Sequence, residues 1–592
     1  MAGVVAAGLE HLYMVKYLLG ILTGIILMFA LLGIMLLVAF TMGSTQPGIE
    51  DDSVLVIRLR GGVPEHVGIE MSFGSWDSKT PATLLEVRNA FKKAAKDDRI
   101  RAIALHCGGL GAGWAKSQEI RWAIEEFKES GKPVVAFMVV AGTLDYFVAS
   151  AADAVYLAPE AFLDLKGLRA EVSFYKDTLA KLGVKAEMQQ IGKYKSAAEP
   201  WSRSSMSNES REVIESVLDE VYGQLLETVA PSRDMTSGAL REVIDNGPFI
   251  SKKALEAGLV DKLGYEDEFY DALKEKLDLE ELKKVSFARY RNVSLESLDL
   301  TGEAQIAIVY AVGSILRGEG ESGGLLGADI LGSDSFSRTL RQVKEDDDIK
   351  AVVLRIDSPG GDALASDQMW REVNRLREEK PMVVSMSNMA ASGGYYIAMA
   401  GAPVVAYPGT YTGSIGVFYG KVNLRGLYDK IGIKKEVITR GRFAAIDSDY
   451  HGFTDAERVK VRESMEAIYQ GFVEKVAQSR GQEWDEIHEV AQGRVWMGSQ
   501  AERNGLVDEI GGFDKAIEMA KEAAGIDAED KVTLITYPAP KPFIEVLLEG
   551  DWLVRDSPAL GLLRSALEGI PYWPPLLEGG VLSMVPYSIS IQ

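Results

Sequence analysis

Two kinds of segment alternate along this chain. Short, mostly apolar runs such as VVLRI (352–356), MVVSM (382–386) and PVVAY (403–407) have the length of buried strands. Between them, SRTLRQVKEDD (337–347) and DQMWREVNRLREE (367–379) repeat apolar residues at helical spacing. Strands that alternate with helices are typical of βαβ units, so the pattern predicts an α/β fold.

The same pattern occurs twice. IRAIALHCGGLGAG (100–113) resembles IKAVVLRIDSPGGD (349–362), and the two begin 249 residues apart (349 − 100). Other pairs keep nearly the same offset: FVASAADAVYLAP (147–159) with YIAMAGAPVVAYP (396–408) at 249, Gly192 with Gly441 at 249, and AGLVDKLG (257–264) with NGLVDEIG (504–511) at 247. Because the offset is nearly constant from the first pair to the last, the sequence predicts one domain duplicated in tandem.

The duplication divides the chain into predicted parts. The segment 266–286 is expected to form a charged helix and a linker between the copies, and PAPKP and PYWPP mark a tail. The predicted boundaries are 1–45 for an N-terminal tail and anchor, 46–300 for the first copy, 301–525 for the second copy, and 526–592 for the tail.

The N-terminal part contains an uncharged apolar run from residue 17 to residue 40. About 20 such residues cross a bilayer core. The run is longer than the apolar region of a cleavable signal peptide, so we expect a retained transmembrane helix rather than a signal peptide or a buried core helix. Lys16 precedes the run and acidic residues 50–52 follow it. This distribution of charge predicts a cytoplasmic N-terminus and a main body on the extracytoplasmic side of the cytoplasmic membrane.

Composition excludes several other classes of protein. Of the 592 residues 47% are hydrophobic and 25% are charged, and the net charge of −22 argues against a nucleic-acid partner. The single cysteine, Cys107, excludes an intramolecular disulfide framework and a cysteine zinc site. The sequence shows neither a cluster of metal ligands nor a GxxxxGK[ST] loop, so we expect no metal, ATP or other cofactor.

Two glycine-rich turns in the second copy are candidates for chemistry. SPGG (358–361) follows a predicted strand, where glycines allow a ligand to approach backbone N–H groups, as in an oxyanion hole; a plain tight turn is the alternative. ASGGYY (391–396) follows the next strand and places Ser392 at a turn that opens a helix. This serine is either a nucleophile or, more commonly for a lone serine, a helix N-cap.

A nucleophilic serine needs a base, and the histidines do not supply an obvious one. None of His11, His66, His106 and His488 lies in a motif that resembles a catalytic triad, and His451 is more simply a surface residue. The alternative base is a lysine kept neutral by burial.

The repeat offers a candidate lysine. At the offset of 249 residues Ser392 corresponds to Thr143, and Lys195 corresponds to Ala444. Lys193 corresponds to Arg442, so that position is basic in both copies and is expected to be structural. A lysine found only in the copy that lacks the serine indicates that the two copies each supply one partner.

These motifs together resemble a known family. In order and spacing, GKYKSAAEP (192–200), DSPGG (357–361), ASGGYY (391–396) and TGSIGV (412–417) are similar to those of the long, duplicated form of signal peptide peptidase A, or protease IV. The resemblance implies tandem duplicated Clp-protease/crotonase-like ββα-repeat domains and a membrane-anchored serine endopeptidase. It covers the chain up to about residue 525, so the tail is left without an implied role.

The resemblance also implies site residues and partners. The family's nucleophile falls on Ser392, its general base on Lys195 and its lysine-orienting hydroxyl on Ser414, where the first copy has Leu165. The backbone N–H groups of Gly361 and Gly393 are the implied oxyanion donors. The implied substrates are apolar peptides such as remnant signal peptides, and the implied assembly is a homotetramer.

Two other classes remain as alternatives. A crotonase-type acyl-CoA enzyme shares the backbone oxyanion hole but generally uses carboxylates and has no anchor. An inactive membrane scaffold derived from a protease would keep the fold without the chemistry, and the changed residues of the first copy make such a loss conceivable.

Overall fold

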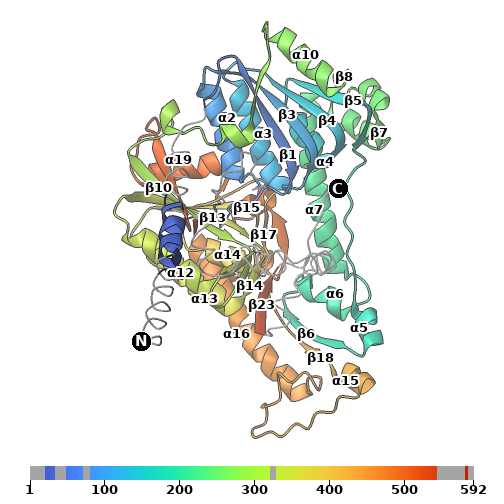
Figure 1. Ribbon diagram of the computed structural model, residues 1–592. Coiled ribbons are helices and arrows are strands. Elements are labelled where there is room, and N and C mark those ends of the chain that lie inside the picture. The colour runs from blue at the N-terminus through green and yellow to red at the C-terminus, as the bar shows by residue number, and fades with distance from the viewer. Residues whose placement is uncertain are drawn as a thin grey trace, which may run out of the picture.

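The structure is a computed structural model that describes residues 16, 20–31, 33, 48–67, 69–70, 81–320, 329–539, 541–542 and 580–584. Two mixed α/β units lie one above the other, with the first copy at the top of Figure 1 and the second below it. The α/β class and the tandem duplication expected from the sequence are therefore seen in the arrangement of the sheets.

The first copy is built on a seven-stranded sheet. Its central strands are parallel and nearly continuously apolar, as expected when helices cover a sheet on both faces. The strands, in spatial order, are β7 (Phe249–Ile250), β5 (Ala154–Asp164), β4 (Val134–Gly142), β3 (Ile100–Leu110), β1 (Ser53–Gly61) and β9 (Lys283–Ser286), with β8 (Lys262–Leu263) beside β5.

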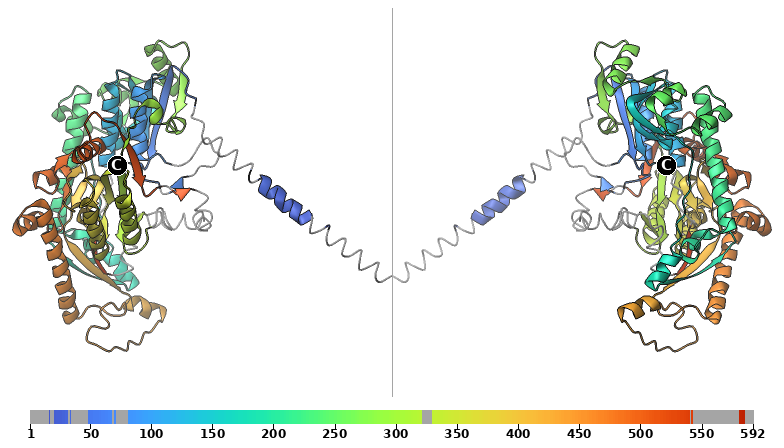
Figure 2. Two further views of the ribbon diagram at one scale, coloured as in Figure 1. Left: turned by 90° about the vertical axis from the view of Figure 1, so that its left-hand side faces the viewer. Right: turned by 90° about the vertical axis from the view of Figure 1, so that its right-hand side faces the viewer.

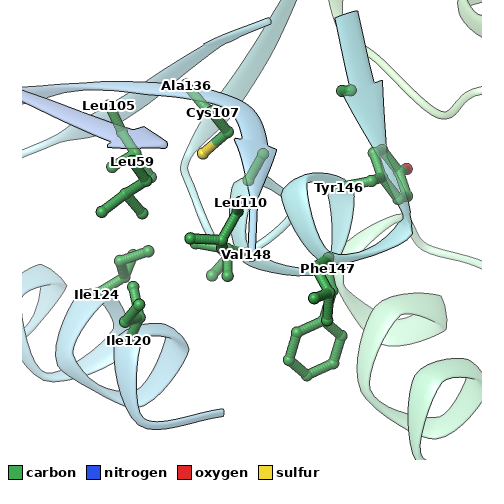
Figure 3. Packing of buried hydrophobic residues seen from close by; sticks show 14 of the residues in the cluster. Leu59, Leu105, Cys107, Leu110, Ile120, Ile124, Ala136, Tyr146, Phe147 and Val148 are labelled. Carbon is green, nitrogen blue, oxygen red and sulfur yellow. The ribbon is translucent and has the colours of Figure 1, made fainter. Parts of the chain in front are cut away.

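Helices cover this sheet and bury its core. Figure 3 shows Leu59 and Leu105 of the sheet close to Ile120 and Ile124 of a covering helix, and all four side chains are buried. The helices of the first copy are α2 (Leu84–Lys96), α3 (Trp114–Lys128), α4 (Thr143–Ala149), α5 (Lys176–Leu182), α6 (Glu199–Ser202), α7 (Asn208–Ser232), α8 (Ser237–Ile244), α9 (Ser251–Glu256), α10 (Glu266–Lys276) and α11 (Phe287–Tyr290).

The sequence predicts a charged helix and a linker at 266–286, and the structure has the helix but not a plain linker. Helix α10 accounts for its first half, but β9 at its end pairs in parallel with β1 and buries Val285. One apolar residue among lysines was too weak a signal to predict an edge strand.

The second copy repeats the arrangement on an eight-stranded sheet. Its edge strand β21 lies beside β10 as β9 lies beside β1, and the two edge strands begin 249 residues apart (532 − 283), so the sheet continues beyond residue 525. The strands, in spatial order, are β19 (Val495–Met497), β17 (Tyr411–Gly413), β15 (Met382–Ala391), β13 (Ile349–Ser358), β10 (Ala304–Val312) and β21 (Val532–Tyr537), with β16 (Val404–Ala406) and β20 (Glu509–Ile510) beside β15.

The helices of the second copy include those predicted at 337–347 and 367–379. They are α12 (Ser333–Glu345), α13 (Ala363–Arg377), α14 (Gly393–Ala398), α15 (Arg425–Ile431), α16 (Asp455–Arg480), α17 (Trp484–Val490), α18 (Gly498–Arg503) and α19 (Phe513–Ala523).

A third sheet joins the two copies. Its strands lie in the order β12 (Ile330–Gly332), β11 (Ser314–Leu316), β14 (Gly360–Asp362), β23 (Gly580–Met584), β18 (Val417–Asn423) and β6 (Lys185–Ile191). Strand β6 belongs to the first copy, and it pairs antiparallel with β18 of the second copy along its full length. Because of this pairing, the residues that follow β6 in the first copy lie against the second copy. A small separate sheet pairs β2 (Ile69–Glu70) with β22 (Lys541–Pro542).

Residues 20–31 are helical and stand apart from the body of the protein in Figure 2. The rest of the predicted transmembrane run, apart from residue 33, lies outside the described residues. Within the part of the chain that the structure describes, no helix has both the length and the apolar character needed for a bilayer crossing.

Candidate active site

The structure brings the predicted serines and the predicted lysine together. Lys195 Nζ lies 2.6 Å from Ser392 Oγ, 2.9 Å from Ser414 Oγ and 2.9 Å from the carbonyl oxygen of Ser414. All three residues have no exposed surface. Residues that are 197 positions apart in the sequence, one from each copy, therefore meet in a single buried cluster.

The backbone holds both serines in an unusual conformation. Ser392 lies between β15 and α14 with φ +58° and ψ −113°, and Ser414 has φ +53°. Positive φ is uncommon for residues other than glycine, and such strain is found at functional turns. The Ser392 N–H donates to the Gly413 carbonyl at 2.8 Å, which ties the two turns together.

Lys195 reaches the site because β6 pairs with β18. The chain leaves β6 at Ile191, and the Tyr194 N–H then donates to the Gln492 carbonyl at 2.9 Å. Gly493 packs directly on Lys195: a Cβ at residue 493 would lie 2.5 Å from the Lys195 Cβ. The second copy thus fits closely around a lysine that the first copy supplies.

Burial changes the protonation of this lysine. It lowers the pKa of Lys195 well below the ordinary lysine value of 10.5, because the charged form loses its hydration. A neutral amine can donate its N–H groups to the two Ser414 oxygens. Its lone pair then remains available to accept the O–H of Ser392, which is the arrangement that a general base requires.

The two predicted oxyanion glycines lie side by side. A Cβ placed on Gly393 would lie 3.0 Å from the Gly361 nitrogen and 2.6 Å from Ser366 Oγ. A Cβ on Gly361 would lie 1.9 Å from the Ile315 carbonyl oxygen. Residue 361 therefore requires glycine for steric reasons, and a side chain at residue 393 would displace that of Ser366. The backbone N–H groups of the two glycines belong to neighbouring segments next to Ser392.

The described histidines make their hydrogen bonds elsewhere. His451 bonds the Gly452 carbonyl, His66 the Pro538 carbonyl, His106 the Tyr270 hydroxyl and His488 the Tyr469 hydroxyl. His11 lies outside the described residues. Lys193 is exposed, with its ammonium group over the Tyr194 ring.

The corresponding place in the first copy is filled by a carboxylate. Asp145 accepts hydrogen bonds from the N–H groups of Gly109, Leu110 and Gly142 at 2.9–3.0 Å. By the offset of 249 residues Asp145 corresponds to Gly394, so a carboxylate is present where the second copy has no side chain. With Leu165 at the position of Ser414, the first copy lacks the polar cluster around Lys195; the sequence showed Asp145, but its hydrogen bonds could not be predicted.

The strand that leads to Ser392 is irregular, and the first copy holds the irregular part. Ile356 pairs with Met386 and Ser358 with Ala390, so residues 387–389 of β15 bulge opposite Asp357 alone. Asn388 donates to the Ala112 carbonyl at 2.7 Å and accepts the Lys116 N–H at 3.2 Å. The first copy thereby fixes the segment just before the nucleophile candidate.

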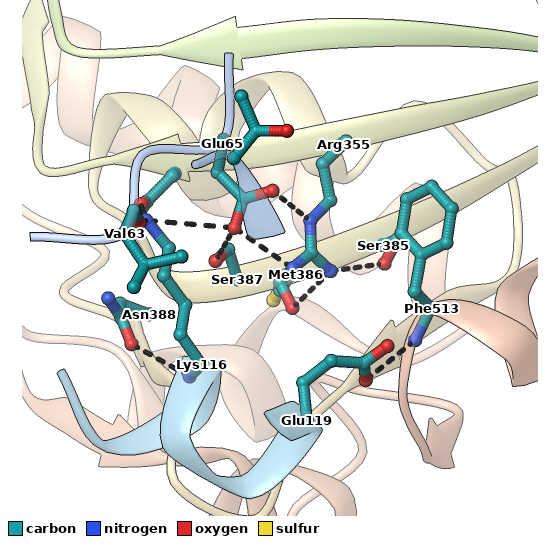
Figure 4. Close-up of polar contacts among 12 residues, drawn as sticks. Val63, Glu65, Lys116, Glu119, Arg355, Ser385, Met386, Ser387, Asn388 and Phe513 are labelled. Atoms are coloured by element: carbon teal, nitrogen blue, oxygen red, sulfur yellow. Dashed lines mark hydrogen bonds and ion pairs between the residues drawn. The ribbon is translucent and has the colours of Figure 1, made fainter. Parts of the chain in front are cut away.

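A buried ionic network surrounds this bulge (Figure 4). Glu65 of the first copy makes two bonds to Arg355, at 2.9 and 3.0 Å, and accepts the Ser387 hydroxyl. Lys116 Nζ lies 2.8 Å from Asp357. Burial alone would raise the pKa of Glu65, but Arg355 and Lys116 lower it to about 2. Nothing in the sequence had indicated this network, because its members are far apart along the chain.

A strained serine beside a buried, proton-accepting amine can carry out nucleophilic acyl transfer, so the site has the chemistry of a serine hydrolase. Residues 126–280 and 374–527 both match the profile of Peptidase family S49. The chain belongs to this family.

Relatives narrow the class further. The chain is 39% identical to "Serine protease SPPA, chloroplastic" of Arabidopsis thaliana over 85% of this chain and 74% of that protein. It is 33% identical to "Protease 4" of Salmonella typhi over 77% of this chain and 75% of that protein. The protein is therefore a serine protease, which decides against the acyl-CoA enzyme.

Among solved structures, ClpP1 from Listeria monocytogenes matches 35% of this chain and 91% of its own, at 15% identity and a TM-score of 0.22. The finer Clp-protease/crotonase-like topology stays a prediction. Among the described residues, no three side chains of His, Cys, Asp or Glu gather as they would around a metal ion.

Proposed function

We propose that this serine protease is a membrane-anchored endopeptidase that uses a Ser392–Lys195 dyad formed across its two copies. The observation that carries the proposal is the 2.6 Å contact between Lys195 Nζ and Ser392 Oγ in a fully buried cluster. Ser414 is the residue that orients the lysine, since both of its oxygens lie 2.9 Å from Nζ.

The proposed mechanism follows from this geometry. Neutral Lys195 accepts the proton of Ser392 as Oγ attacks the peptide carbonyl carbon, and the N–H groups of Gly361 and Gly393 stabilise the oxyanion. The Lys195 ammonium then protonates the leaving amine, which gives an acyl-enzyme on Ser392. A water molecule, deprotonated by Lys195, hydrolyses the ester and restores both residues.

Apolar peptides such as remnant signal peptides are the proposed substrates. A relative in Enterococcus faecium, 30% identical over 39% of this chain and 67% of its own, is named "Putative signal peptide peptidase SppA". The uncharged run at 17–40 supports anchoring in the cytoplasmic membrane, with the body on the extracytoplasmic side. Alkaline extraction of membranes tests the anchor: the full chain should stay with the membrane and a chain lacking residues 1–45 should not.

Peptide hydrolysis by four purified proteins tests the dyad. Ser392→Ala and Lys195→Ala should each lose activity by several orders of magnitude while remaining folded, and Lys193→Ala should keep the activity of the wild type. Residual activity in Lys195→Ala comparable to wild type would mean that another group is the base. An inactive wild type on a broad panel of apolar peptides would favour the scaffold.

The assembly is proposed to be a homotetramer in which contacts between chains repeat the contact between copies. Within the chain, β6 of the first copy pairs with β18 of the second. The corresponding segments, 434–440 and 168–174, are described residues that form no strand, and all of 434–440 is exposed. We infer that 434–440 of one chain pairs with 168–174 of the next.

Exposed apolar residues support the same arrangement. Val139 and Val140 are 51% and 65% exposed, whereas the corresponding Asn388 and Met389 are partly covered by the first copy. In solution, Val140→Glu and Ile438→Glu should each lower the oligomer mass measured by light scattering. Leu255→Glu, an equally drastic change on α9, should not. A wild type that is monomeric in detergent would contradict the proposal.

A further inference from the structure

The C-terminal strand β23 occupies a position in the middle of the third sheet. It is antiparallel to both neighbours: residues 582–584 pair with 360–362 of β14, and residues 580–582 pair with 418–420 of β18. Figure 1 shows this strand, in red, beside β14. A segment whose role the sequence left open therefore completes a sheet that contains both copies.

The two strands that flank β23 form the two sides of the candidate active site. Strand β14 contains Gly361, whose partner in the pairing is Ser583. Strand β18 begins three residues after Ser414, and its other edge pairs with β6, which leads to Lys195. The backbone of residues 580–584 thus lies directly beside one of the two proposed oxyanion donors.

A peptide substrate needs this same place. An extended peptide binds most simply by adding a strand to an open sheet edge, and without β23 the edges of β14 and β18 would be open toward each other. Neighbouring strands are spaced by about 4.8 Å, so a gap between two such edges accepts one strand at a time. Strand β23 and a substrate that contacts Gly361 exclude each other.

We propose that the C-terminal segment is a tethered peptide ligand of the active site, with residues 580–584 in the strand position that a peptide substrate must take. This inference rests on the proposed function, since it uses Gly361 as an oxyanion donor. The sequence fits the role: from residue 569 to the C-terminus the only charged side chain is that of Glu578, and GVLSM (580–584) is uncharged and mostly apolar.

The tether makes this ligand an effective competitor. Strands β22 and β23 are separated by 37 residues of the same chain (580 − 542 − 1), so the ligand binds within one molecule, which corresponds to an effective concentration on the order of a millimolar. A free peptide must compete with the tail, so the tail raises the apparent KM without altering the groups that perform the reaction.

Removing the strand tests the proposal. A chain that ends at residue 579 should hydrolyse an apolar peptide with an apparent KM about tenfold lower and a similar kcat. A synthetic peptide of residues 578–592 should inhibit this chain competitively. The same peptide with proline at 582 and 583 should inhibit at least about tenfold less, because the N–H groups of consecutive strand residues point to opposite neighbours and proline removes both donors.

A binding measurement separates this inference from the proposed mechanism. Fluorescently labelled peptide 578–592 should bind the shortened chain that also carries Ser392→Ala, and the proline peptide should not. Binding without hydrolysis by any form of the chain would refute the dyad and keep the tail ligand. An unchanged KM together with no binding of the labelled peptide would overturn the tail ligand. The intact masses of the wild type and of Ser392→Ala are measured in parallel. Loss of the tail by hydrolysis in the wild type but not in Ser392→Ala would also support the proposal that the tail binds in the active site.

Discussion

At the scale of single residues, the site depends on what surrounds Lys195. The described contacts of its amine are three oxygens of two serines, and the cause of its lowered pKa is burial. Ser392 and Ser414 both adopt a positive φ that places their hydroxyls on this amine. The first copy has Thr143 and Leu165 at the two corresponding positions, and neither of them has a positive φ.

The buried lysine predicts a specific dependence of stability on pH. Because the folded state lowers the pKa of Lys195 below 10.5, the unfolded state binds more protons in the interval between the lowered value and 10.5. The contribution of Lys195 to the free energy of unfolding therefore increases as the pH rises across that interval. The melting temperature of Lys195→Met should rise less than that of the wild type between about pH 7 and about pH 10. Parallel curves would show that the lysine is not buried in the neutral form.

At the scale of elements, the copies are interlocked rather than merely adjacent. Strand β6 of the first copy extends the third sheet, and α3 of the first copy holds the bulge of β15. Bulges next to active sites redirect a strand and the side chains that follow it. Asn388, four residues before Ser392, contacts the first copy from this bulge, as does Ser387 through its hydrogen bond to Glu65.

Asn388 is therefore expected to act as a positioning residue. Asn388→Ala removes hydrogen bonds to Ala112 and Lys116, and it should lower kcat by about tenfold with KM changed less than about twofold. Asn374→Ala is the matched control, since Asn374 bonds only within α13, to the Trp370 carbonyl. Steady-state kinetics with unfolding midpoints for both variants distinguish a positioning role from a loss of stability. Equal kcat values in the two variants would refute it.

The sequence predicted the helices and strands that have a strong local pattern. It did not predict the strand pairings that depend on contacts between distant parts of the chain. The strands at 352–356 and 382–386 were predictable from short apolar runs, and the helices at 337–347 and 367–379 from apolar residues at helical spacing. The pairing of β6 with β18 was not predictable, since it depends on how two copies dock. The same is true of β23, because a five-residue apolar strand in a tail carries no signal for its partner.

At the scale of the whole molecule, one buried ionic network connects the two copies. Arg355 and Glu65 are both buried, and each comes from a different copy. The offset helped to find Lys195 because a lysine without a counterpart can be noticed in a repeat. It could not reveal Glu65, whose importance comes only from lying beside Arg355.

Removing one partner of the Glu65–Arg355 ion pair should lower the stability of the protein substantially. Glu65→Gln leaves the Arg355 cation buried without its counter-charge and should reduce the free energy of unfolding by about 3–5 kcal/mol. Glu266→Gln, which removes the exposed partner of Arg58, should cost less than about 1 kcal/mol. The pKa of Glu65 is about 2, so its contribution is present above the ordinary value of 4.5 and is lost as the pH falls toward 2. Denaturant unfolding at neutral pH measures both variants, and equal losses would contradict the account.

The central claim is that Lys195 of one copy activates Ser392 of the other. The most direct test is the rate at which an acylating peptide inhibitor modifies Ser392, followed by mass spectrometry as a function of pH. In the wild type the rate should rise with pH and level off well below pH 10.5, as the lowered pKa of Lys195 requires. In Lys195→Ala the rate should fall by orders of magnitude, and it should not do so in Lys193→Ala. Equal rates of modification in the wild type and in a folded Lys195→Ala would contradict the claim.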